Sequence, residues 1–235
     1  MAINLLAAIP RPWTVTTFVP NERETHILGG NQAHSIAGFD LAQTLRTRAR
    51  RQGMVWLVRS ETELRYPRAD GTTGSFYPDV LLALDVDLDD REPYDGQAVG
   101  KPPSLVVEVI SPRTADKDVG PKRAAYAEMG VVEYLTFDPR PRKKLALHGY
   151  RLAGRGRYVE IAPEVEGGLW LATVGLRVEA EGRTQPFRGP LLRLTTGEGE
   201  RLLHVDEETE ARDAAEHEVA RLRRLLDRAE PDRRA

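Results

Sequence analysis

The chain has 235 residues, 40% of them hydrophobic, so it can bury a sizeable core, and its length suits one domain with appendages. Its 34 Lys and Arg residues are balanced by 36 Asp and Glu residues, which excludes the global positive charge of strongly basic nucleic-acid-binding proteins. The sequence contains no cysteine, which excludes disulfides, thiolate zinc sites and cysteine nucleophiles. It also lacks a run of ~20 apolar residues and a signal-peptide pattern, so we expect a soluble, cytoplasmic protein without a membrane partner.

Residues 1–32 contain prolines that break any long element, and we assign no structure there. A helix is predicted over residues 33–52, because small and apolar residues recur at helical spacing and Gly53 can end it. Its inward stripe includes His34, which is either a core histidine or a site residue. Its other side carries four arginines, which either form a solvated face or contact a phosphate backbone: Arg46, Arg48, Arg50 and Arg51.

Short strands follow the first helix. Residues 54–58 and 62–66 read as strands separated by a polar turn, and we expect them to be antiparallel neighbours. A third strand is predicted over residues 77–84, with Pro78 tolerated at its start, so Asp79 lies at a strand entrance. The acidic run over residues 85–90 has Asp90 where a calcium loop needs glycine, which favours a solvated acidic loop over an EF-hand.

Residues 104–110 are apolar on both alternating faces, which indicates a strand covered on both sides. Glu108 interrupts this pattern. A buried carboxylate loses several kcal/mol on desolvation unless it is paired, protonated or bound to a metal. We therefore expect Glu108 to have a partner.

A short helix is predicted next, with Pro121 in its first turn and Gly130 as its stop. Lys122, Ala125, Tyr126 and Met129 recur at i, i+3, i+4 and i+7 along it, so Lys122 lies on the apolar stripe and should face inward. A strand over residues 133–138 follows, and this strand–helix–strand order predicts a parallel crossover unit.

The rest of the chain contains a predicted hairpin over residues 144–162, and segments at 169–174 and 176–180 are expected to complete the sheet. A long charged helix is predicted over residues 206–229, and its narrow apolar seam either docks on the chain's own core or pairs with a second copy in a homodimer. We expect an N-terminal extension (1–32), one α/β domain with a mixed sheet flanked by helices (33–203) and a charged C-terminal helix (204–235).

Asp79 and Glu108 would enter one sheet on adjacent or nearby strands, where two carboxylates repel each other without a cation. A divalent metal would resolve the repulsion, and oxygen ligands favour Mg²⁺ or Mn²⁺. Lys122 could then orient an attacking water and offset charge on a phosphate. A buried Glu108–Lys122 ion pair, with Asp79 capping a turn, explains the same spacing equally well.

Three segments carry a resemblance to a known family: YPDV over residues 77–80, LVVEVISP over 105–112 and DVGPKRAAYAEMGVVEYLTFDP over 118–139. Together they resemble the Uma-two family of restriction-endonuclease-like proteins, over roughly residues 33–160. The resemblance implies the PD-(D/E)XK nuclease fold, a mixed sheet flanked by helices, and metal-dependent phosphodiester hydrolysis. It further implies that Asp79 is the first acid, that Glu108 is the second, and that the main-chain carbonyl of Val109 completes the metal shell.

The sequence departs from the superfamily pattern at Ile110, which stands where the lysine is usual, two residues after the second acid. The resemblance implies that Lys122 replaces it from the following helix, and that His34 lies near the site. The acidic segment usual before the first helix is poorly matched, with Glu22 and Glu24 as stand-ins.

We therefore expect an endonuclease that uses Mg²⁺ or Mn²⁺ to hydrolyse nucleic-acid phosphodiester bonds, with DNA as the expected substrate. Two alternatives stay open. One is a non-catalytic nuclease-fold module that binds nucleic acid or protein, and the other is hydrolysis of a small phosphodiester.

Overall fold

A computed structural model of the protein describes residues 15–17, 32–88, 92–110, 119–139, 146–154, 156–182 and 190–229, with the side chains of all but 32–34, 119, 146 and 227–229. The chain divides into two compact units, Met1–Leu202 and Leu203–Ala235.

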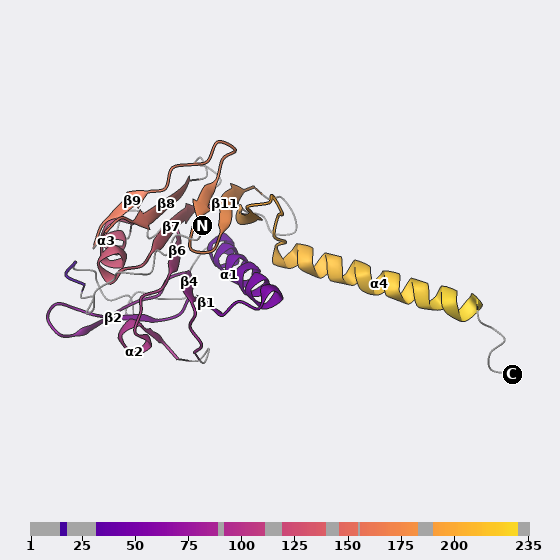
Figure 1. Cartoon of the computed structure of the whole chain (residues 1–235), viewed down its shortest axis with the longest axis horizontal. Coiled ribbons are helices and arrows are strands. Elements are labelled where there is room, and N and C mark those ends of the chain that lie inside the picture. The colour runs from indigo at the N-terminus through magenta and orange to yellow at the C-terminus, as the bar shows by residue number, and fades with distance from the viewer. Residues whose placement is uncertain are drawn as a thin grey trace. The chain divides into compact units, whose positions relative to one another are not determined.

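The first unit is built on a six-stranded mixed sheet in the order β1-β4-β6-β7-β8-β9 (Figure 1). Its strands are β1 (Trp56–Ser60), β4 (Val80–Leu84), β6 (Leu105–Val109), β7 (Glu133–Asp138), β8 (Ala146–Leu152) and β9 (Tyr158–Glu160). Strands β6 and β7 pair in parallel, because α3 (Val119–Met129) lies between them in the chain, and the other pairs in this sheet are antiparallel. The predicted α/β fold and the predicted parallel crossover are therefore confirmed.

One face of the six-stranded sheet packs against α1 (Gln32–Gln52) and a second sheet. This sheet contains β10 (Leu169–Leu171), β11 (Leu176–Glu181) and β12 (Leu191–Thr196), which pair antiparallel. The prediction that residues 169–180 complete the main sheet is thus wrong. Apolar side chains of β10 and β11 face the main sheet across a shared core, so these strands form a layer of their own.

The opposite face of the six-stranded sheet packs against α3 and a small sheet in the order β3-β2-β5. Its strands are β3 (Thr73–Phe76), β2 (Leu64–Pro67) and β5 (Tyr94–Asp95), and α2 (Gly96–Val99) follows. The prediction that β1 and β2 are neighbours is wrong, because β1 pairs with β4 and β2 pairs with β3 and β5. The middle of β1 is buried on both faces, whereas β2 alternates between buried and half-buried residues and suits an outer layer.

The helix α3 begins with Pro121 in its first turn, where no backbone N–H is needed, and Gly130 follows its end with a φ of 91°. Glu128 of this helix contacts residues 16 and 17 of the N-terminal segment. The backbone N–H and hydroxyl groups of Thr16 and Thr17 all donate to the Glu128 carboxylate. Burial by itself would raise the pKa of Glu128, but these hydrogen bonds outweigh burial and lower the pKa.

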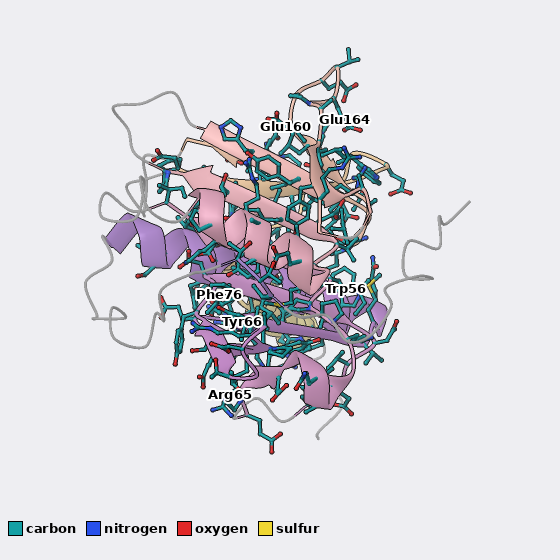
Figure 2. All side chains as sticks on the ribbon, turned by 90° about the vertical axis from the view of Figure 1, so that its left-hand side faces the viewer. Trp56, Arg65, Tyr66, Phe76, Glu160 and Glu164 are labelled. Atoms are coloured by element: carbon teal, nitrogen blue, oxygen red, sulfur yellow. The ribbon has the colours of Figure 1, made fainter. Side chains whose placement is uncertain are left out.

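A row of aromatic rings connects the small sheet to α3. Tyr66 and Phe76 are stacked with ring centroids 4.6 Å apart and lie side by side in Figure 2. The Phe76 ring lies 5.0 Å from Tyr126 on α3, which lies 5.3 Å from Tyr134 on β7. Because all four side chains are buried, the row fixes the position of α3 above the sheet.

The second unit contains α4 (Val205–Ala229), a 25-residue helix whose extent agrees with the predicted charged helix. At its start the backbone N–H of His204 donates to Oε2 of Glu207 over 2.8 Å, a contact that satisfies one of the donors at the helix end. Within the ranges that the structure covers, no helix is both long enough and apolar enough to cross a bilayer.

The close packing at Gly74 predicts a specific sensitivity. An added Cβ there would lie 2.5 Å from Cζ of Tyr66, so Gly74→Ala must displace a buried, stacked ring. We expect a loss of about 1–3 kcal/mol in the free energy of unfolding, measured by urea denaturation. Gly120→Ala is the matched control, because nothing lies within 4 Å of its added Cβ, and equal stability of the two variants would contradict this account of Gly74.

Candidate functional site

Asp79 and Glu108 lie where β4 begins and β6 ends. Asp79 directly precedes β4, whose first residue, Val80, pairs with Val107 of β6, and Glu108 is the next residue of β6. The two residues are buried, with exposed fractions of 8% and 7%. Oδ2 of Asp79 accepts a 2.7 Å hydrogen bond from the backbone N–H of Val109, which fixes this carboxylate against β6.

The Glu108 carboxylate faces α3. Val107 and Val109 belong to the core on the α1 side, and Val106 belongs to the core on the α3 side, so strand alternation directs Glu108 toward α3. Its Oε1 accepts a 2.7 Å hydrogen bond from the Tyr126 hydroxyl and lies 3.4 Å from Nζ of Lys122. The Tyr126 contact has the length of a strong charge-assisted bond, whereas the Lys122 contact is long.

The inward orientation predicted for Lys122 is confirmed. Its side chain is buried, with 6% exposure, although it lies in the first turn of α3. A helical side chain four residues before Tyr126 lies on the same face of the helix, so both side chains reach Glu108. Lys122 contacts Glu108 from the helix that follows β6, and buried Ile110 follows the end of that strand.

The backbone N–H and C=O groups of Val109 point toward β4. Its N–H points to Asp79 on the β4 side, and the N–H of the next residue, Ile110, donates to the carbonyl of Phe137 on β7. Because N–H and C=O of one residue in a strand point the same way, the Val109 carbonyl points to the β4 side, where Asp79 lies.

The first helix passes close to this site. An added Cβ at Gly38 of α1 would lie 3.5 Å from Cβ of Asp79, an ordinary van der Waals distance, so α1 passes directly beside Asp79. His34 lies in the first turn of α1, but its side chain is outside the described part of the structure. Glu22 and Glu24 also lie outside the described residues.

Of the four arginines on α1, Arg46 has a clear structural contact. Its Nε donates to the carbonyl of Val58 over 2.8 Å, which connects the helix to β1.

Three residues beside the site were not predicted from the sequence to have a functional role. Tyr126 belongs to the inward stripe of its helix, where a buried tyrosine hydroxyl needs a partner, and that requirement is the available signal. Thr136 pairs with Glu108 in the parallel register, and Asp138 follows two residues later on β7. Both are buried, and alternation from Tyr134 places them on the α3 side of the sheet.

The donor set suits a hard divalent cation. Two carboxylates and one ammonium, from Asp79, Glu108 and Lys122, carry a net formal charge of −1 in a buried setting. Carboxylate and carbonyl oxygens are the ligands that Mg²⁺ and Mn²⁺ prefer. Within the described ranges no group of three or more His, Cys, Asp or Glu residues could hold a metal.

Comparison with known proteins agrees with the family resemblance. The family model Uma2, described as a putative restriction endonuclease, matches residues 24–184, and the chain therefore belongs to this family. A similar solved structure is a putative nuclease belonging to DUF820 from Anabaena variabilis, with 13% sequence identity and a TM-score of 0.41. The similarity covers 58% of this chain and 74% of that one. No curated protein matches the chain.

The buried Glu108–Lys122 contact predicts a large stability effect. Lys122→Met leaves two buried carboxylates without this ammonium, so we expect a loss of about 3–5 kcal/mol in the free energy of unfolding. Glu108→Gln combined with Lys122→Met should recover part of that loss in urea denaturation.

Arg221→Met is the control for this experiment, because Arg221 and Glu218 are 65% and 50% exposed in their ion pair and such pairs contribute little. A Lys122→Met protein as stable as the Arg221→Met protein would show that Lys122 does not compensate Glu108.

Proposed function

We propose that this protein is a divalent-metal-dependent endonuclease that hydrolyses phosphodiester bonds in nucleic acid, with DNA as the substrate. The observation that carries the proposal is the burial of Asp79, just before β4, and of Glu108 on the adjacent strand β6, with Lys122 of α3 against the Glu108 carboxylate. Membership of a family described as putative restriction endonucleases supports the choice of DNA, because restriction enzymes act on DNA.

Asp79, Glu108 and the main-chain carbonyl of Val109 would hold Mg²⁺ or Mn²⁺. When bound, such an ion lowers the pKa of a coordinated water and stabilises negative charge on the phosphate. The backbone N–H of Val109 keeps Asp79 in place, and the Tyr126 hydroxyl fixes one oxygen of Glu108. A carboxylate has about four lone-pair sites, so these hydrogen bonds are compatible with cation binding.

Lys122 would contact the attacking water and the phosphate of the substrate. Its ammonium carries three N–H donors, and the contact to Glu108 is long at 3.4 Å. In this role Lys122 orients the attacking water and offsets the charge that grows on the phosphate oxygens. Burial strengthens such an interaction, because the surrounding dielectric is lower than that of water.

A non-catalytic nuclease-fold module is the second candidate. The observation that favours it is Ile110, a buried apolar residue at the position where the superfamily usually has its lysine. Calorimetric titration with Mn²⁺ separates the two candidates. A module without a metal site releases no binding heat, whereas the proposed nuclease binds Mn²⁺ and loses binding on Asp79→Asn.

The nuclease proposal predicts cleavage of plasmid or single-stranded DNA with Mg²⁺ or Mn²⁺. Asp79→Asn and Glu108→Gln should each reduce the cleavage rate by about a hundredfold or more, because each removes charge at the site. Asp95→Asn is the matched control, since Asp95 caps α2 and asparagine caps a helix equally well. Absence of cleavage by the unaltered protein, together with absence of metal-binding heat, would overturn the proposal.

A separate prediction concerns Tyr126 as a residue that positions Glu108. Tyr126→Phe removes the 2.7 Å hydrogen bond to Glu108 and should weaken Mn²⁺ binding about 10–100-fold in calorimetry. Tyr158→Phe is the matched control, because it removes a 2.8 Å hydrogen bond to the Val131 carbonyl without touching Glu108. Equal Mn²⁺ affinities of the two variants would exclude the positioning role.

A further inference from the structure

The helix α4 exposes an apolar seam. Val219 and Leu222 are each 48% exposed and Leu226 is 64% exposed, and with Ala215 they alternate by four and three along the helix. Such spacing places these side chains on one narrow stripe, as in a two-stranded coiled coil. Large apolar side chains gathered on one exposed stripe mark an interaction surface.

The charges on α4 are divided along its length. Residues 205–218 carry one basic residue, Arg212, whereas residues 219–229 carry one acid, Asp227, and four basic residues: Arg221, Arg223, Arg224 and Arg228. The acidic residues of the first part are Asp206, Glu207, Glu208, Glu210, Asp213, Glu216 and Glu218. A parallel copy would therefore place like net charge side by side over both parts, with Glu218 beside Arg223 as an opposite pair, whereas an antiparallel copy would place the acidic part against the basic part.

We propose that α4 pairs with α4 of a second copy of this chain in an antiparallel two-stranded coiled coil. The seam sets the register, with Val219 against Leu222 of the second copy and Ala215 against its Leu226. Val219 of each copy contacts Leu222 of the other, and the same holds for Ala215 and Leu226. The contact is therefore self-complementary and closes as a dimer with two-fold symmetry.

Charged residues beside the seam agree with this orientation. In the antiparallel register Glu216 lies beside Arg223 of the second copy, and the pair occurs twice by symmetry. A parallel pair would instead bring together the two copies of Glu208 and of Arg212, which fall on the continuation of the seam. A parallel pair would also place Glu218 beside Arg223 of the second copy. To pair with Arg223, Glu218 would have to leave Arg221, with which it forms hydrogen bonds of 2.8 and 2.9 Å on its own helix.

Sedimentation velocity of the full-length chain over a range of concentrations tests the pairing. We expect a dimer that dissociates on dilution, because the seam is short, and we expect Leu222→Gln or Leu226→Gln to leave a monomer. Leu225→Gln is the matched control, since Leu225 is also 48% exposed but lies off the seam, and it should still dimerise. A monomeric chain at every concentration, or a dimer unaffected by both seam substitutions, would overturn the proposal.

Charge exchange tests the orientation. Arg223→Glu should weaken the dimer, and adding Glu216→Arg should restore it, because the antiparallel register makes these two residues neighbours. Restoration by Glu218→Arg instead would show parallel helices and would overturn the proposal. The chain has no cysteine, so a Glu216→Cys protein mixed with an Arg223→Cys protein should also form a disulfide-linked dimer under oxidation. Cleavage of DNA is not read in these experiments, so their outcome is independent of the nuclease proposal.

Discussion

The structure depends on the burial of two carboxylates at the junction of β4 and β6. An isolated buried carboxylate is strongly unfavourable, so the surrounding chain must supply donors and positive charge. Asp79 accepts a hydrogen bond from the backbone N–H of Val109. Glu108 accepts one from the Tyr126 hydroxyl and lies next to the Lys122 ammonium. These contacts join a strand entrance, a strand end and a helix, so the fold around the site cannot be rearranged without leaving a charge uncompensated.

The layers around the sheet place these donors. The helix α3 can present Lys122 and Tyr126 to Glu108 because its apolar stripe packs on the sheet and the aromatic row holds it beside β3. On the opposite face, α1 and the second sheet cover the sheet with apolar side chains. Glu108 and Lys122 therefore lie on the α3 side of a sheet that is covered on both faces, where a low local dielectric strengthens their interaction.

Particular elements show how far the sequence could be interpreted. The strand around Glu108, the helix after it and the parallel partner β7 were predictable, because their signals are local: apolar runs, a proline, a glycine and helical spacing. The pairing of β1 with β4 instead of β2 was not, since strand partners are chosen by burial across the whole core. For the same reason residues 169–180 could be recognised as strands but not assigned to a second sheet.

The sequence by itself determined the class of the protein and the identity of its principal charged residues. An acid in a strand that is apolar on both faces, and a lysine on an apolar helical stripe, are anomalies that remain visible without coordinates. Tertiary structure alone decided that Asp79 accepts the backbone N–H of Val109, next to Glu108 on the adjacent strand, and that Tyr126 makes a shorter contact to Glu108 than Lys122 does. These features depend on register and on helix placement, which are set by packing between segments far apart in the chain.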